Sequence, residues 1–407
     1  MMSSPFVTSR IPPLVFGAGM RTTIKEHIEG VVLGAGAPPS PRVLLISGRA
    51  VASSSRFDEL RHSLASGFTV DHRTVHGEPS PDQVNAIVHA GQAAPPDIVV
   101  AVGGGSTIDT GKAVAAAFSL PDPIESYLEG VGDKTPTGAK LPFVAVPTTA
   151  GTGSEATKNA VLSRTGPDGF KKSLRHDNYV PDLALVDPEL TIDCPRSVTA
   201  ASGLDAFTQL LEAYLSTKAS VFTDTLCESG MYAFASGFPE VLADGGNVEA
   251  RSAVSYAAFL SGVALATAGL GLVHGLASPI GARAPVPHGV VCGALLAPVL
   301  QASLPSIDGV ALGKLARVAD IIDRASGRHG PIVPAAGEPL LAAATRSRAE
   351  AALAAIEDWV GAADLPGFSE FGLDAVGARA AAAEAGHKNH PAKLDQESIK
   401  ALVLGRL

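Results

Sequence analysis

The stretch DIVVAVGGGSTIDT, residues 97–110, joins an apolar run to a glycine-rich turn and the start of a helical segment. Glycines let a backbone approach a phosphate closely, and a helix N-terminus adds free N–H groups and the positive end of its dipole. We therefore expect a diphosphate cradle here, built from Gly103, Gly104, Gly105, Ser106 and Asp109. The alternative is a tight strand-to-helix turn that binds nothing.

Two common phosphate motifs do not fit this turn. Ser106 stands where a Walker loop needs its first glycine, and Ala113 stands where that motif needs a Ser or Thr for magnesium. Ile108 occupies the third glycine position of the strict dinucleotide fingerprint. The turn is therefore compatible with phosphate but matches neither motif.

A second glycine-rich loop, PTTAGTGSE at residues 147–155, also follows an apolar run. It offers the hydroxyl groups of Thr148, Thr149, Thr152 and Ser154. Loops at the ends of two strands converge on one crevice in an open α/β sheet, and a dinucleotide fits such a crevice. The alternative is an ordinary capped turn, because Ser and Thr are common helix caps.

The first half of the chain alternates short apolar runs with helical or turn-rich segments, which predicts βαβ units and a mostly parallel sheet. The expected strands cover residues 42–47, 68–72, 97–102, 143–146 and 183–186. Residues 80–90 (SPDQVNAIVHA) predict a helix that begins with a Ser cap and a Pro at its first position.

After Asp187-Pro188 the sequence is dominated by Ala and Leu at helical spacing. We expect an α/β domain over residues 1–195 and an all-α domain over residues 196–407. Within the second domain, residues 340–356 predict a helix and the Pro-rich residues 331–339 predict a loop.

Charge and cysteine usage exclude several classes of protein. The 407 residues carry a net charge of −9, which argues against a nucleic-acid partner. The 3 cysteines show no C-x-x-C spacing, so neither a disulfide framework nor a thiolate metal knot is indicated. With Arg10 and two prolines near the N-terminus, no export signal is visible, and we expect a cytoplasmic protein.

One uncharged stretch, residues 252–273, is long enough to raise the question of a membrane span. Ser, Thr, Gly and Ala dilute it, and no aromatic belts flank it. We expect a buried helix and no membrane association.

Four motifs together resemble one known family. GGGSTIDTGKA, PTTAGTGSE, GLDAFTQLLEAY and GLGLVHGLASPIGARAPVPHG are similar, in order and spacing, to the iron-containing (group III) alcohol dehydrogenases, and the later KNHPAKLD resembles the family's tail. The resemblance implies a dehydroquinate synthase-like architecture, in which residues 1–195 form an α/β domain that binds NAD(P) and residues 196–407 form a helical domain that holds a divalent metal and the substrate. It also implies hydride transfer between nicotinamide and a small alcohol, aldehyde or ketone.

The resemblance assigns metal ligands to Asp205, His274 and His288. The family's histidine four positions after the aspartate is Gln209 here, and a further histidine near the nicotinamide is Ser278. Gln209 shares a helical face with Asp205 but is a weaker ligand than imidazole, so we expect weaker binding of Fe²⁺ or Zn²⁺. Ser278 joins the catalytic set as the start of a proton path, although a passive role for Gln209 or Ser278 is equally open.

The sequence also indicates which nicotinamide cofactor is preferred. NAD-preferring relatives place an Asp after the first strand, whereas here Gly48 and Arg49 follow residues 42–47, and Arg56 comes soon after. No carboxylate would repel a 2′-phosphate there, so we expect NADP(H) to be preferred over NAD(H). Lys172 is a further expected cofactor contact.

Three other functions are also compatible with the sequence. A maleylacetate-type reductase would resemble this fold without needing metal, a dehydroquinate-synthase-like lyase would share the architecture, and a cofactor-binding protein could have lost catalysis through Gln209 and Ser278. Arg283 could anchor an anionic substrate or lie on the surface. The apolar second half also favours a homodimer.

Overall fold

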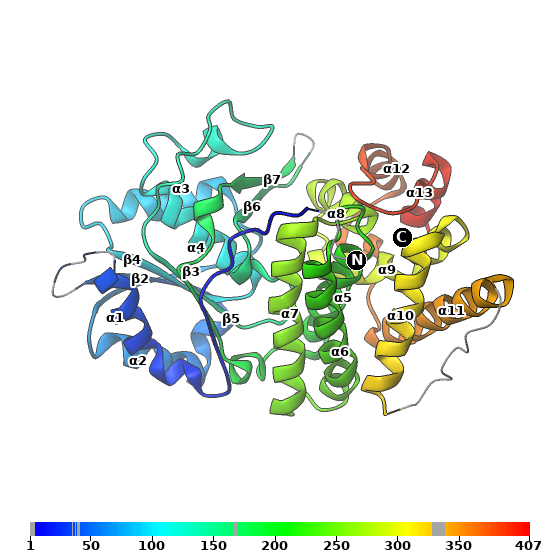
Figure 1. The fold of residues 1–407 in the computed structure, drawn as a ribbon. Helices are drawn as coiled ribbons and strands as arrows, with labels where there is room; N and C mark the ends of the chain where they lie inside the picture. Colours follow the sequence, from blue (N-terminus) through cyan, green and yellow to red (C-terminus); the bar gives the residue numbers. More distant parts are fainter. Residues whose placement is uncertain (1–4, 35, 37, 39–40, 167–168, 328–337) are drawn as a thin grey trace. The chain divides into compact units, whose positions relative to one another are not determined.

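The computed structural model describes residues 5–34, 36, 38, 41–166, 169–327 and 338–407. The chain divides into two compact units (Figure 1). One holds most of residues 9–194, and the other holds residues 195–407 together with the N-terminal residues 5–8.

The first unit is built on a six-stranded parallel sheet with the strand order β1-β8-β5-β4-β2-β3. This confirms the predicted α/β fold with a mostly parallel sheet. The strands are β1 (Leu14–Phe16), β2 (Arg42–Gly48), β3 (Thr69–Val75), β4 (Ile98–Gly103), β5 (Phe143–Pro147) and β8 (Leu183–Val186). The short edge strand β1 was not expected from the sequence, because three residues are too few to show a pattern.

Both faces of this sheet are buried by helices. Along β4, Val99 and Ala101 point to one core, and Val100 and Val102 point to the other. Helices α1 (Ile24–Gly34) and α2 (Ser55–Ala65) contribute to the second core, and α3 (Pro81–Gly91) and α4 (Gly105–Ala117) contribute to the first. Burial on both faces explains why the central strands are unbroken apolar runs.

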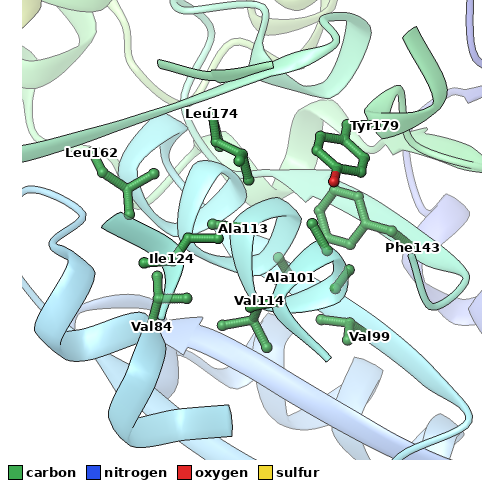
Figure 2. Close-up of a cluster of buried hydrophobic side chains, with 14 of the residues drawn as sticks. Val84, Val99, Ala101, Ala113, Val114, Ile124, Phe143, Leu162, Leu174 and Tyr179 are labelled. Atoms are coloured by element: carbon green, nitrogen blue, oxygen red, sulfur yellow. The ribbon is translucent and has the colours of Figure 1, made fainter. Parts of the chain in front are cut away.

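A separate antiparallel hairpin, β6 (Asn159–Arg164) and β7 (Phe170–Arg175), covers part of the first core. Figure 2 shows Leu162 and Leu174 from this hairpin around the same core as Ala113 and Val114 of α4. The hairpin was not predicted from the sequence, because β7 carries two lysines and an arginine in six residues.

The second unit is helical, and no strand occurs between residues 195 and 407 in the part that the structure describes, as predicted. Its helices are α5 (Arg196–Leu215), α6 (Val221–Ala243), α7 (Val248–Ala268), α8 (Leu272–Arg283), α9 (His288–Ser303), α10 (Gly309–Ala325), α11 (Glu338–Ala363), α12 (Ala375–Glu384) and α13 (Gln396–Leu404). The helix expected over residues 340–356 lies inside α11. Most of the loop expected over residues 331–339 lies outside the described residues.

The helix expected over residues 252–273 is in fact two helices. α7 ends at Ala268, the chain turns at Gly269 with φ of 69°, and α8 begins at Leu272 after a bend of 98°. Another stretch, His288–Ser306, is long and apolar enough to cross a membrane, and 67% of its apolar window is buried inside the protein. Such burial is typical of a core helix.

Candidate metal centre and phosphate-binding loops

Four side chains of the helical unit form a compact group of metal-ligating atoms, which we call the donor cluster: Asp205, His274, His288 and Cys292. Their ligand atoms all lie within 4.8 Å of one another. Asp205 Oδ1 lies 3.3 Å from His274 Nε2 and 3.7 Å from His288 Nε2. The structure therefore brings together the carboxylate and both imidazoles that the resemblance assigns to a metal.

Helix α5 supplies Asp205 and also Glu212, seven residues later and on the same helical face. Glu212 accepts a 2.7 Å hydrogen bond from His274 Nδ1 and another of 2.7 Å from the backbone N–H of Val273. A carboxylate on the outer nitrogen fixes the ring and leaves Nε2 facing the cluster, as in many metal sites. Glu212 was not predicted from the sequence, although its spacing of seven residues from Asp205 places both on one helical face.

Close packing of α9 against α5 brings His288 and Cys292 to Asp205. A Cβ on Gly289 would lie 2.6 Å from the backbone oxygen of Ala201, and one on Gly293 would lie 3.0 Å from Leu204 Cβ. A Cβ at Gly289 would overlap the backbone of α5, and one at Gly293 would crowd Leu204. Because α9 begins at His288, Cys292 follows one turn later on the same face.

Three groups of the cluster have shifted pKa values, and burial raises the pKa of the Cys292 thiol to about 12. Burial raises the pKa of Asp205, but the charge of His288 and the hydrogen bond from His274 outweigh it and bring that pKa down to about 2. Burial lowers the pKa of His274, but interactions with Cys292, Asp205 and Glu212 outweigh it and hold that pKa well above its ordinary value. The site therefore favours positive charge at its centre.

A metal ion fits this demand. Asp205 is 1% exposed, and its Oδ2 has no hydrogen-bond partner among the described residues. Because His274 Nδ1 donates to Glu212, a neutral His274 ring would turn a lone pair on Nε2 toward the carboxylate of Asp205. Two acceptors in contact need a cation between them, either a proton or a metal.

The two residues that replace family histidines lie in different surroundings. Gln209 is buried on α5, and its side-chain oxygen accepts a 2.7 Å hydrogen bond from Ser261 Oγ of α7. Ser278 lies one turn after His274 on α8 and is exposed. The amide oxygen expected as a metal ligand is thus already engaged by a hydroxyl.

In the α/β unit, the two glycine-rich loops meet. Thr148 N–H donates to the Gly103 carbonyl at 2.9 Å. A Cβ on Gly104 would lie 3.4 Å from the Thr149 side chain, and one on Gly105 would lie 2.5 Å from Thr152 Oγ1. The glycines of the first loop therefore allow contact with the threonines of the second.

Lys112 and Asp109 of α4 form hydrogen bonds with the second loop and with strand β6, which follows it. Lys112 is fully buried and donates 2.8 Å hydrogen bonds to the carbonyls of Ser154 and Asn159. Asp109 accepts from Val161 N–H at 2.9 Å. The expected cofactor residue Asp109 is thus engaged with β6, and Lys112, three residues further along α4, was not predicted from the sequence.

Burial shifts these groups strongly. It raises the pKa of Asp109 and lowers the pKa of Lys112 to about 8. It also raises the pKa of Glu155, in the second loop, to about 7.

The other residues expected to contact the cofactor lie further apart. Gly48 ends β2 and Arg49 follows it with an exposed side chain, and Ser106 lies half-buried in the first turn of α4. Arg56 donates to both carboxylate oxygens of Asp193, at 3.0 and 2.9 Å, so its guanidinium is already paired. Lys172 is exposed on β7.

Arg283 has a structural partner. It forms an ion pair with Glu384 and donates to the Pro279 carbonyl at 3.0 Å. The half-buried guanidinium is thus engaged by a carboxylate, which does not support a role as substrate anchor.

Comparison with known proteins defines the class. The sequence model described as "Iron-containing alcohol dehydrogenase" matches residues 12–188, and that described as "Fe-containing alcohol dehydrogenase family, C-terminal" matches residues 199–405. The chain belongs to the iron-containing alcohol dehydrogenase family, which confirms the resemblance.

Individual relatives agree with this assignment. A probable alcohol dehydrogenase EutG of Escherichia coli is 37% identical over 225 residues, 55% of this chain and 56% of that protein. The match thus spans about half the length of that relative. An NAD-dependent methanol dehydrogenase of Bacillus methanolicus is 31% identical over 299 residues, 72% of each chain. A crystal structure of 1,3-propanediol oxidoreductase superposes with a TM-score of 0.83 at 27% identity, covering 99% of this chain and 100% of the other.

Proposed function

We propose that the protein is an oxidoreductase that transfers hydride between a nicotinamide cofactor and a small alcohol, aldehyde or ketone. One observation carries the proposal: Asp205, His274 and His288 meet in the helical unit with Glu212 behind His274. The family and the names of its relatives, which include alcohol, methanol and propanediol dehydrogenases, support it.

Asp205, His274 and His288 would hold a divalent metal, iron or zinc. When bound, such a metal polarises a carbonyl oxygen or lowers the pKa of an alcohol, while the cofactor gives or takes hydride at its nicotinamide ring. Glu212 keeps the Nδ1 proton of His274, so that Nε2 presents its lone pair. Ser278 would pass the substrate proton toward water through its exposed hydroxyl.

We assign the dinucleotide phosphates to the two glycine-rich loops. The start of α4 supports this, because its N-cap Gly104 has no side-chain cap and leaves N–H groups at the positive end of the helix. Lys112 positions the second loop by holding the Ser154 carbonyl.

We also propose a preference for NADP(H). The support is the sequence after β2, where Gly48 and Arg49 stand in place of a carboxylate. Arg49 and Arg56 are the two arginines that could bind the 2′-phosphate of NADP(H). Because Arg56 is paired with Asp193, Arg49 is the residue to test. A cytoplasmic homodimer remains the proposed setting, on the evidence of three free cysteines and a largely apolar helical unit.

The decisive experiment combines metal analysis with turnover. Protein purified without added metal is assayed for bound metal and for NADPH-dependent reduction of a panel of small aldehydes and ketones. His288→Ala should abolish both, whereas His89→Ala, which changes an exposed histidine on α3, should alter neither.

Two outcomes would contradict the proposal. A full rate in His288→Ala would exclude this metal site. A full rate after exhaustive chelation would instead favour the metal-independent, maleylacetate-type reductase.

A further inference from the structure

We propose that Cys292 is a metal ligand that takes the place left by Gln209, so that the site is built from one carboxylate, two imidazoles and one thiolate. The inference rests on the proposed metal site and adds a ligand that the family resemblance does not assign.

The first argument is the position of the sulfur. Cys292 Sγ lies 3.5 Å from His274 Nε2 and 3.6 Å from His288 Nε2. A tetrahedral zinc with ordinary bond lengths places nitrogen and sulfur ligands about 3.6 Å apart, and nitrogen and oxygen ligands about 3.3 Å apart. The corresponding nitrogen–oxygen distances here are 3.3 and 3.7 Å. The four edges of the tetrahedron that the structure defines therefore agree with a four-ligand site.

The second argument is the chemistry of the contacts. A thiol has one proton and can donate to only one of the two imidazole nitrogens that it touches. Asp205 Oδ2 also has no hydrogen-bond partner among the residues that the structure describes, although Asp205 is 1% exposed. One cation bound to the sulfur, both nitrogens and the carboxylate would satisfy all of these atoms together.

The third argument is the state of Gln209. Its side-chain oxygen accepts from Ser261 Oγ at 2.7 Å, so binding a metal through it would cost that buried hydrogen bond. Cys292 carries no such competing bond to α7 and lies on the same face of α9 as His288.

A thiolate changes which metal the site prefers. Soft sulfur ligands favour zinc, whereas oxygen and nitrogen ligands alone discriminate less. Binding replaces the S–H bond by a metal–sulfur bond and releases one proton to water, so Asp205 and Cys292 together balance the charge of a divalent ion. Four protein ligands complete a tetrahedron, and substrate would then use a fifth position, which zinc can provide.

The test uses the full-length protein loaded with zinc or cobalt. X-ray absorption of the zinc form should show one sulfur neighbour at about 2.3 Å beside nitrogen and oxygen neighbours at about 2.0–2.1 Å. The cobalt form should show the near-ultraviolet absorption of a thiolate bound to Co²⁺. Cys292→Ser should remove the sulfur signal and weaken metal affinity by more than about 10-fold, the lower limit for loss of an outer partner.

Two control variants make the result specific. Gln209→Ala and Cys194→Ala should both keep the sulfur signal, because one alters the rival ligand and the other a cysteine outside the donor cluster. Metal bound with only nitrogen and oxygen neighbours in the unmutated protein would overturn the role of Cys292 and leave the proposed function standing. Failure of the unmutated protein to bind zinc or cobalt would overturn both.

Discussion

Glu212 and His274 share a 2.7 Å hydrogen bond inside the helical unit, and both side chains are almost fully buried. Burial raises the pKa of Glu212, but the hydrogen bond and charge of His274 outweigh it and lower that pKa. The ionised carboxylate can only accept, so the imidazole must donate from Nδ1. This single contact decides which nitrogen of His274 faces Asp205.

Replacing that carboxylate should weaken metal binding without removing a ligand. In Glu212→Gln we expect metal affinity to fall by about 10–100-fold, because the amide holds the imidazole less strongly and lowers its basicity. Titration with a chelating competitor measures this. The control is Glu228→Gln on α6, whose carboxylate accepts a hydrogen bond from Tyr214 of α5. It should leave metal affinity unchanged. Equal affinities in all three proteins would show that Glu212 does not orient His274.

The approach of α9 to α5 should also be sensitive to a single methyl group. Gly289→Ala places a Cβ 2.6 Å from the Ala201 carbonyl oxygen, so the helices must separate. We expect a loss of about 1–3 kcal/mol in the free energy of unfolding, together with lower metal content.

The matched control is Gly361→Ala, because a Cβ at this exposed helical glycine meets nothing within 4 Å. It should stabilise the protein by about 0.5–1 kcal/mol. Denaturant unfolding of both variants gives the comparison, and a Gly289→Ala protein as stable as the Gly361→Ala protein would refute the packing argument.

Lys112 should be important for the stability of the α/β unit. Lys112→Met removes two hydrogen bonds to buried carbonyls and the cation 3.9 Å from Asp109. We expect a loss of about 3 kcal/mol, since buried groups lose their partners. Lys158→Met, which breaks the exposed pair with Asp177, should cost less than about 1 kcal/mol. Similar unfolding midpoints for the two variants would contradict this reading.

The raised pKa of Glu155 predicts that the stability of the protein depends on pH. Its pKa is raised by burial from an ordinary 4.5 to about 7, so the folded state holds the proton more tightly than the unfolded state. The stabilising contribution of this proton is complete below a pH of about 4.5 and is lost as pH rises through about 7. Glu155→Gln should therefore gain stability relative to the unmutated protein between about pH 5 and pH 8. Thermal unfolding across this range tests it, and a stability difference that does not change with pH would refute it.

The sheet could be predicted because its central strands are buried on both faces. Val99 and Val100 must both be apolar, and such runs are visible in one sequence. β1 and β7 escaped prediction because the first has three residues and the second is rich in charge. The break between α7 and α8 depends on a positive φ at Gly269, which hydrophobic periodicity does not reveal.

The candidate metal site was only partly readable. Asp205, His274 and His288 were found through motif order, and the structure brings them together. Cys292 could not be recognised from cysteine spacing, because it has no second cysteine nearby and lies one helical turn after a histidine. Only packing shows that Gln209 is engaged by Ser261, because α7 lies about fifty residues further along the chain.

The donor cluster draws its four side chains from α5, α8 and α9, and His274 of α8 lies 69 positions after Asp205 of α5. An unfolded chain cannot hold these atoms together, so an ion that binds them stabilises the folded helices relative to the unfolded chain. The melting temperature then depends on the supply of metal. At a free metal concentration one hundred times the dissociation constant, binding adds about 2.7 kcal/mol to the free energy of unfolding. Metal starvation would loosen the helical unit as well as slow its chemistry.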